Sequence, residues 1–257
     1  MVSSRAAPRT HPKDNRLLES FSAADYEFVL PHLEYIPMPL GMVVYESGSA
    51  QHFVYFPADC IVSLLYVLES GASTEIAVTG KEGLVGISLI MGGESTPSRA
   101  VVQSAGTGFR IRGAVLKKLF DSSGEAQHLL LRFTQALITQ MTQTAVCNRH
   151  HVVDQQLCRW LLLSMDRLPS NRLMMTQELI ANMLGVRREG VTEAAGKLQA
   201  DGLIEYSRGN ITVLDRPGLE ARVCECYAVV KHEYDRLLAS HALPAASLSD
   251  EARSPLA

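Results

Sequence analysis

The sequence predicts an α+β protein in which a β-rich first half is joined by a long helix to a smaller helical second half. Three observations support this fold class. Short β-rich runs separated by turn residues recur at roughly eight-to-twelve-residue spacing between about residues 34 and 111. Residues 114–168 then follow a nearly unbroken helical pattern. Residues 174–214 have the pattern of two short helices followed by a hairpin.

The composition is that of an ordinary folded protein with room for two domains. The chain has 257 residues, of which 47% are hydrophobic and 20% charged, and its formal net charge is −3. It contains no run of about eighteen apolar residues, so no membrane span is expected. Its start lacks the apolar stretch of a signal peptide. Five cysteines without a framework spacing favour a reducing cytoplasm.

The β-rich domain is predicted to span residues 17–122, after a disordered tail at residues 1–16. Apolar residues between Leu17 and Leu30 indicate short packed helices at its start. The strands that follow are typical of a sandwich or barrel. Their sequence runs are YIPM, MVVYESG, HFVYF, CIVSLLYVL, TEIAVTG, RAVVQ and GFRI.

Within the long helical region, residues 123–150 carry a narrow stripe whose members recur at three- and four-residue steps. Such a stripe is typical of a coiled-coil seam between two chains, although the same periodicity fits a helix packed on its own domain. The stripe consists of Leu130, Phe133, Leu137, Met141, Thr144 and Cys147.

The stripe is interrupted at residues 148–151, which include two adjacent histidines. Neighbouring side chains on a helix diverge by about 100°. His150 and His151 therefore cannot readily share a metal ion without further ligands, and we interpret them as polar residues of a hinge.

The first of the two short helices has clear end signals. Thr176 is placed to cap its N-terminus, and an acidic residue, Glu178, follows in the first turn. Gly185 can adopt the left-handed conformation that ends a helix at no steric cost. A sharp turn is therefore expected between this helix and the next.

The second helix separates an apolar face from a cluster of polar residues in its opening turns. In a helix-turn-helix such residues reach base edges in the major groove, where Arg bonds guanine and Glu accepts from cytosine. Arg188, Glu189 and Thr192 are the candidates for base contact, and Arg187 is the candidate for phosphate contact. A hairpin after this helix is a wing, with Arg208 near its tip facing the DNA backbone. The alternative is a helix pair within an ordinary helical core.

The charge balance of residues 172–215 indicates that one copy of this unit binds phosphates weakly. The segment has five Lys/Arg and six Asp/Glu residues. Phosphate contacts dominate affinity for DNA, so a dimer that doubles the contacts is expected.

Residues 176–215 resemble the DNA-binding domain of the Crp/Fnr family of bacterial transcription regulators. The positions that carry the resemblance are Thr176, Ala181, Leu184, Gly185, Arg188, Glu189, Val191, Leu198, Gly202 and Ile204. The resemblance implies a cytoplasmic homodimeric regulator without enzymatic activity, which binds double-stranded DNA and RNA polymerase. It assigns residues 123–150 to the dimer interface and residues 151–220 to a winged helix-turn-helix. The expected DNA-binding residues are Thr176, Gln177, Arg187, Arg188, Glu189, Thr192, Glu193 and Arg208. Glu193 departs from the family, in which a second Arg is common at this place.

The same resemblance implies that the first domain is a double-stranded β-roll like a cyclic-nucleotide-binding domain. In the family, the nucleotide cradle of this domain has a Glu for the ribose hydroxyl and an Arg for the cyclic phosphate. Here Ile87 replaces the Glu. If the following strand keeps its register, Ser98 takes the Arg position and Arg99, offset by one residue, is aimed away. The alternative is that the longer loop at residues 91–96 absorbs this offset. We therefore expect an effector other than cyclic AMP, or none. The alternative is a cyclic-nucleotide-responsive activator. The expected effector pocket comprises Gly86, Ile87, Ser88, Ser98, Arg99 and Ala100.

The last segment, residues 221–257, is predicted to hold a terminal helix and a disordered tail. The helical pattern of this terminal helix extends from about Leu219 to Leu238. Cys224 and Cys226 are the one close pair of cysteines. Two thiolates without a matching His/Cys set make a poor zinc site, so buried small residues are the preferred interpretation, and no metal or cofactor is expected. An enzyme or redox protein using this pair and the histidines is the rival class, but it lacks a nucleophile, base and acid at suitable spacing.

Overall fold

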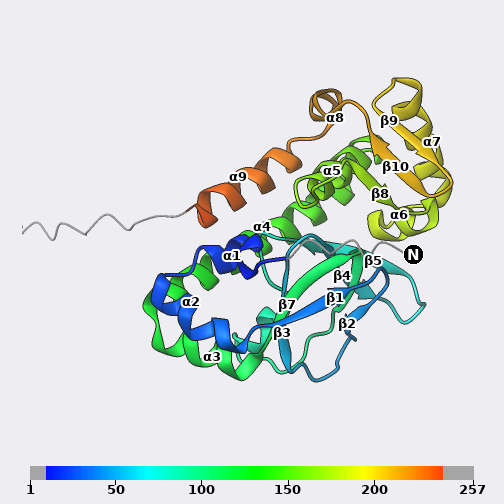
Figure 1. Ribbon diagram of the computed structural model, residues 1–257. Helices are drawn as coiled ribbons and strands as arrows, with labels where there is room; N and C mark the ends of the chain where they lie inside the picture. The colour runs from blue at the N-terminus through cyan, green and yellow to red at the C-terminus, as the bar shows by residue number, and fades with distance from the viewer. Residues whose placement is uncertain (1–9, 240–257) are drawn as a thin grey trace, which may run out of the picture.

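The computed structural model describes residues 10–239 and shows a β-roll, a long central helix and a C-terminal helical domain (Figure 1). The two predicted tails fall mostly outside the described residues. Residues 10–16, however, are ordered, which corrects the predicted start of the fold. A short 3₁₀ helix, Pro12–Asp14, leads to Asn15, which is fully buried. The Asn15 amide donates to the carbonyl oxygens of Pro57 and Gly83, each at 2.8 Å. These bonds fasten the segment to the β-roll.

The β-roll consists of two antiparallel sheets, and each of its seven strands overlaps one of the predicted runs. Helices α1 (Arg16–Glu19) and α2 (Ala23–Val29) precede it. The three-stranded sheet has the order β1 (Glu34–Met38), β7 (Gly106–Arg112), β3 (Phe53–Pro57). The four-stranded sheet has the order β2 (Val43–Tyr45), β6 (Arg99–Ser104), β4 (Ile61–Val67), β5 (Ser73–Thr79).

Three helices make up the nearly unbroken helical region: α3 (Gly113–Ser122), α4 (Gly124–His150) and α5 (Val153–Met165). Ser123 separates the first two and caps α4, because its hydroxyl accepts the backbone N–H of Ala126. His151 and Val152 have extended backbones and separate α4 from α5. In Figure 1, α4 runs between the β-roll and the two helices α5 and α9.

The stripe predicted as a dimer seam packs inside its own protomer. Leu130, Phe133, Leu137 and Cys147 are buried, while Met141 and Thr144 are partly buried. The reason is a close approach of α4 to the loop after β5, where a Cβ on Gly83 would collide with the Phe133 ring. Gly83 is thus a packing glycine rather than only a turn residue. The stripe forms core rather than an interface between chains.

The C-terminal domain contains the predicted helix-turn-helix and wing, with one additional strand. Helices α6 (Gln177–Leu184) and α7 (Arg188–Ala200) are followed by the hairpin β9 (Ile204–Ser207) and β10 (Asn210–Val213). Strand β8 (Arg172–Met174), which was not predicted, pairs with β10 to give the sheet order β8, β10, β9.

The predicted single terminal helix is two helices, α8 (Arg216–Arg222) and α9 (Cys226–Leu238). Val223 has an extended backbone that ends α8, and the chain then turns back so that α9 packs on α4. No helix in residues 10–239 combines the length and the hydropathy that a bilayer crossing needs.

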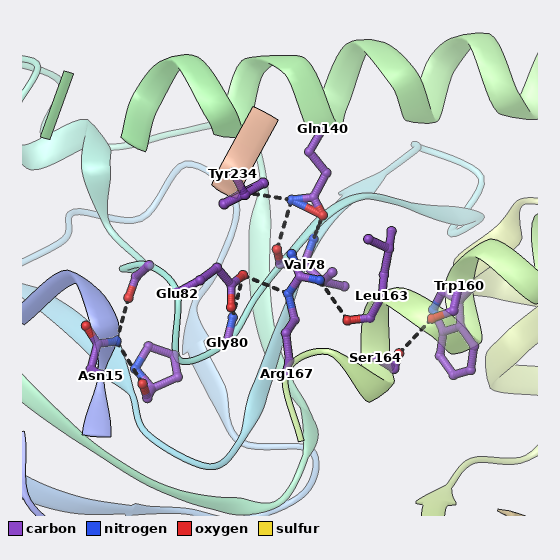
Figure 2. A network of polar contacts seen from close by, with 12 residues as sticks. Asn15, Val78, Gly80, Glu82, Gln140, Trp160, Leu163, Ser164, Arg167 and Tyr234 are labelled. Atoms are coloured by element: carbon purple, nitrogen blue, oxygen red, sulfur yellow. Dashed lines mark hydrogen bonds and ion pairs between the residues drawn. The ribbon is translucent and has the colours of Figure 1, made fainter. Parts of the chain in front are cut away.

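A buried polar network joins the β-roll to the helices around it (Figure 2). The Gln140 amide on α4 donates to the Val78 carbonyl on β5 at 3.0 Å and to the Tyr234 hydroxyl on α9 at 3.2 Å. Beside it, Arg167 after α5 pairs with Glu82 after β5 at 2.7 Å. Four separate parts of the chain, which are β5 with its following loop, α4, the end of α5 and α9, therefore meet at one satisfied set of polar groups.

Candidate nucleic-acid interface

The turn between α6 and α7 is built as the sequence predicts. The Thr176 hydroxyl accepts the backbone N–H of Leu179 at 3.3 Å and so caps α6. Gly185 ends α6 with φ at 67°, and its N–H bonds back to the last turn. Ile180 and Leu184 bury the inner face of α6. The turn therefore fixes where α7 begins.

Helix α7 presents its polar residues to solvent and buries the opposite face. Val191, Ala194 and Leu198 are buried where α7 packs on α5 and α6. The exposed residues at its start are Arg187, Arg188, Glu189, Thr192 and Glu193. Arg187 occupies the N-cap position, and Arg188 is the first helical residue. Both guanidinium groups thus lie at the end of α7 that a recognition helix directs into the major groove.

Side-chain contacts link α7 to the start of α6. The Thr192 hydroxyl donates to Gln177 Oε1 at 2.9 Å. The next residue, Glu193, pairs at 2.9 Å with Lys197 one turn further on, which lowers the pKa of Glu193 and keeps it charged. Glu193 is therefore engaged within its own helix.

The wing places Arg208 at its tip. Arg208 and Gly209 both have positive φ, at 49° and 79°, and Arg208 is the one non-glycine residue with positive φ among residues 10–239. Two successive positive φ values are typical of the tight turns that match strand twist in hairpins. A Cβ at Gly209 would lie 3.7 Å from the Thr176 side chain. The wing tip thus lies beside the N-terminus of α6.

These contacts bring the predicted DNA-binding residues together. Gln177 and Thr192 connect α6 with α7, and Thr176 and Gly209 connect α6 with the wing. The set forms one continuous, largely exposed surface of the C-terminal domain.

The predicted effector-pocket residues do not all face the same side of the β-roll. Gly86 has φ at 104° and starts the 3₁₀ helix Ile87–Leu89, where the Ser88 hydroxyl donates to Gln51 at 2.8 Å. Ser98 and Ala100 are buried, and the Ser98 hydroxyl lies 3.1 Å from that of Thr96. Arg99 instead forms an ion pair with Glu46 at 3.0 Å.

The position that would need a cation for a phosphate is therefore a serine, which also lies 3.4 Å from the Tyr45 hydroxyl. A hollow of about 150 Å³ lies next to it, with Tyr45 and Gln51 in its wall. The lining offers hydroxyl and amide groups, and it includes none of the six residues predicted for the pocket.

A second cluster of functional groups was missed by sequence reasoning. Cys147 and His151 at the end of α4 meet Cys224, which precedes α9, and Cys226, the first residue of α9, with their ligand atoms all within 4.8 Å of one another. The Cys147 and Cys224 thiols are hydrogen-bonded at 3.6 Å, and this bond lowers the pKa of Cys224 to about 6. His150, one residue earlier, is exposed and lies outside the cluster. The available signal was a Cys and a His four residues apart on one helix, together with a Cys-x-Cys pair.

Comparison with known proteins agrees with this domain structure. Residues 155–222 match the family model of the Crp-like helix-turn-helix domain. No curated protein sequence matches the chain.

Among solved structures, a putative Crp/Fnr-family transcriptional regulator from Eubacterium rectale is similar with a TM-score of 0.64 and 18% identity, covering 81% of this chain and 98% of that one. FixK2 from Bradyrhizobium japonicum gives a TM-score of 0.63 and 16% identity over 75% of this chain and 98% of its own. The c-di-GMP-responsive global regulator CLP from Xanthomonas campestris gives a TM-score of 0.59 and 18% identity, over 76% of this chain and 100% of its own.

Proposed function

Because this chain has the Crp/Fnr-type regulator fold with a Crp-like helix-turn-helix domain, we propose that it acts as a homodimer on a two-fold symmetric DNA operator. The observation that carries the proposal is the continuous exposed surface formed by α6, the start of α7 and the wing. Arg188, Glu189 and Thr192 are assigned to base edges in the major groove, and Arg187 and Arg208 to the DNA backbone.

A dimer follows from the charge balance and from an exposed seam on α4. Five basic and six acidic residues in 172–215 leave one domain with few phosphate contacts to offer. Next to the buried stripe, α4 carries a second row of residues at alternating four- and three-residue steps, and all of them are exposed. The row consists of Leu131, Gln135, Ile138, Thr142, Ala145 and Arg149.

This exposed seam is the surface that we assign to a second copy of the chain. Leu131 and Ile138 are 49% and 56% exposed, so two large apolar side chains of this row face solvent in the single chain. The steps of four and three residues are those of a coiled-coil interface. Pairing two α4 helices would bring two C-terminal domains to one DNA duplex.

Selection of bound fragments from random or genomic DNA, followed by footprinting, tests this function. We expect an inverted repeat with half-sites about one helical turn, roughly 34–36 Å, apart. As a control, Arg236→Ala should select the same sequence as the native protein, because Arg236 is exposed on α9 and pairs with Glu233. Recovery of fragments with no common sequence would count against the proposal.

We place the effector outside the cyclic mononucleotides. Ile87 replaces the hydroxyl acceptor, and the inward position of the phosphate partner is Ser98, while Arg99 pairs with Glu46. Calorimetry with cyclic AMP and with cyclic GMP distinguishes this from the alternative of a cyclic-nucleotide-responsive activator. We expect no heat of binding in the micromolar range, and saturable binding of either nucleotide would favour the alternative. RNA polymerase remains an expected partner, and no catalytic role is proposed.

A further inference from the structure

Three thiols and one imidazole converge where α4 ends and α9 begins. Cys147 lies in the last turn of α4, His151 follows its end, and Cys224 and Cys226 flank the start of α9. All three cysteines are buried, at 0%, 3% and 1% exposure. The four ligand atoms lie within 4.8 Å of one another. They come from chain segments more than seventy residues apart, so the fold itself assembles the group.

The spacing of these atoms fits one tetrahedral ion. With zinc–sulfur bonds of about 2.3 Å, neighbouring ligand atoms of a tetrahedron lie about 3.8 Å apart. Cys147 Sγ lies 3.6 Å from Cys224 Sγ, and Cys226 Sγ lies 3.6 Å from His151 Nδ1. Thiolate and imidazole are the donors that zinc takes in closed structural sites, and a set of three Cys and one His is among the commonest.

We propose that Cys147, His151, Cys224 and Cys226 form a structural zinc site. The four protein ligands complete a tetrahedron and leave no position open for a reacting water. This assignment is independent of DNA binding, and it reverses the interpretation of the two Cys residues as mere packing.

The surroundings of the cluster support a bound cation. His151 Nε2, the nitrogen that faces away from Cys226, lies 3.4 Å from the Glu225 carboxylate. A carboxylate on the second nitrogen of a metal-binding histidine fixes its tautomer and strengthens it as a ligand. Three thiolates and one zinc ion carry a net charge of −1, and the buried guanidinium of Arg159 acts on Cys147 and Cys226 with a compensating positive charge.

The ion would fasten the end of α4 to the start of α9, where the chain already has the contact between His151 and Glu225. His151 belongs to the two-residue break between α4 and α5, and α5 leads into the helix-turn-helix. Cys224 and Cys226 hold the start of α9. A zinc ion at this point would fix the angle of the hinge and seat α9 on α4.

Cobalt titration of the full-length protein, purified under reducing conditions and stripped with a chelator, tests the site. We expect one equivalent of Co²⁺ to bind with the absorption bands of tetrahedral cobalt and of thiolate-to-cobalt charge transfer, and Zn²⁺ to displace it. Elemental analysis of the protein as purified should give one zinc per chain.

Three variants distinguish the proposed metal ligands from residues that only lie near them. Cys224→Ser should weaken cobalt binding at least a hundredfold and lose charge-transfer intensity. Cys158→Ser, which changes another buried cysteine outside the cluster, should bind like the native protein. Glu225→Gln keeps all four ligands and should weaken binding about tenfold or more.

The proposal is overturned if the native protein shows no thiolate-to-cobalt band, a result that needs no folded variant. It is also overturned if Cys224→Ser and Cys158→Ser bind alike. Recovery of a Cys147–Cys224 disulfide from reduced, metal-free protein after brief exposure to air, together with absence of metal binding, would assign the cluster to redox chemistry instead.

Discussion

The Nε atom of Arg167 lies 2.7 Å from Oε1 of Glu82, in an ion pair whose side chains are only 5% and 12% exposed. Arg167 follows α5, and Glu82 lies in the loop after β5, so the pair joins the β-roll to the segment that leads into the DNA-binding domain (Figure 2). Arg167 also donates to the Leu163 carbonyl at 2.7 Å. The Arg167 guanidinium is thus bound on one side by the β-roll and on the other by α5.

Arg167→Met should lower the free energy of unfolding by about 3–5 kcal/mol, because it leaves the Glu82 carboxylate buried without its partner. Urea denaturation measures this change. Arg236→Met is the control, since the exposed pair of Arg236 with Glu233 should contribute less than about 1 kcal/mol. Adding Glu82→Gln to Arg167→Met should recover part of the loss. Equal losses for the two Arg variants would refute a special role of the buried pair.

Glu75 should make stability depend on pH. Burial raises its pKa from 4.5 to about 7, although Ser63 and Arg159 act in the opposite direction. Between those two values the folded state binds more protons than the unfolded state, so stability falls as pH rises through this window. The full shift corresponds to about 3 kcal/mol.

Glu75→Gln removes this contribution, so the stability difference between variant and native protein should move in favour of the variant from pH 5 to pH 8. Urea denaturation of both proteins at the two pH values checks this, and other titrating groups cancel in the comparison. A difference that does not change with pH would mean that Glu75 titrates normally.

Gly83→Ala should destabilise the protein by about 1–3 kcal/mol, as overpacking of a close-packed core usually does. The added Cβ would collide with the Phe133 ring, which α4 presses onto the loop. Gly124→Ala is the control at the start of the same helix, where nothing lies within 4 Å of the added Cβ. Thermal denaturation compares the two. If Gly83→Ala melts like the native protein, the contact between α4 and the loop is looser than described.

Ile138→Lys should convert a dimer into monomers, because it places a charge in the middle of the exposed seam of α4. Sedimentation velocity over a range of protein concentrations measures the change. Met91→Lys alters another exposed apolar residue, which is 64% exposed and is not part of α4, and should leave the dimer intact. An undiminished dimer in Ile138→Lys would exclude the seam as the interface.

The sequence predicted elements whose signals are local. Thr176 and Gly185 bounded α6 through capping and a left-handed backbone, and the strands of the β-roll followed from alternation and turn residues. Strand β8 was missed because three residues are too few to show a period, and its pairing with β10 depends on the distant wing.

The stripe on α4 shows a different limit. Periodicity identifies an apolar face, but it does not say whether the face meets the same chain or another. Phe133 belongs to the core because Gly83, fifty residues away, makes room for its ring. Likewise, the break at Val223 that brings Cys224 and Cys226 to Cys147 has no strong local signal. Only the packing of α9 on α4 assembles that cluster.

One measurement most directly tests the proposal that the exposed surface of α6, the start of α7 and the wing binds DNA. It compares the affinities of Arg188→Ala and Arg208→Ala for the selected operator and for a scrambled duplex at the same salt concentration. Arg188→Ala should lose about 1–3 kcal/mol of binding free energy on the operator alone, and Arg208→Ala should weaken both duplexes alike. Equal weakening of both duplexes by Arg188→Ala, or no effect on either, would contradict the assignment of α7 as the recognition helix.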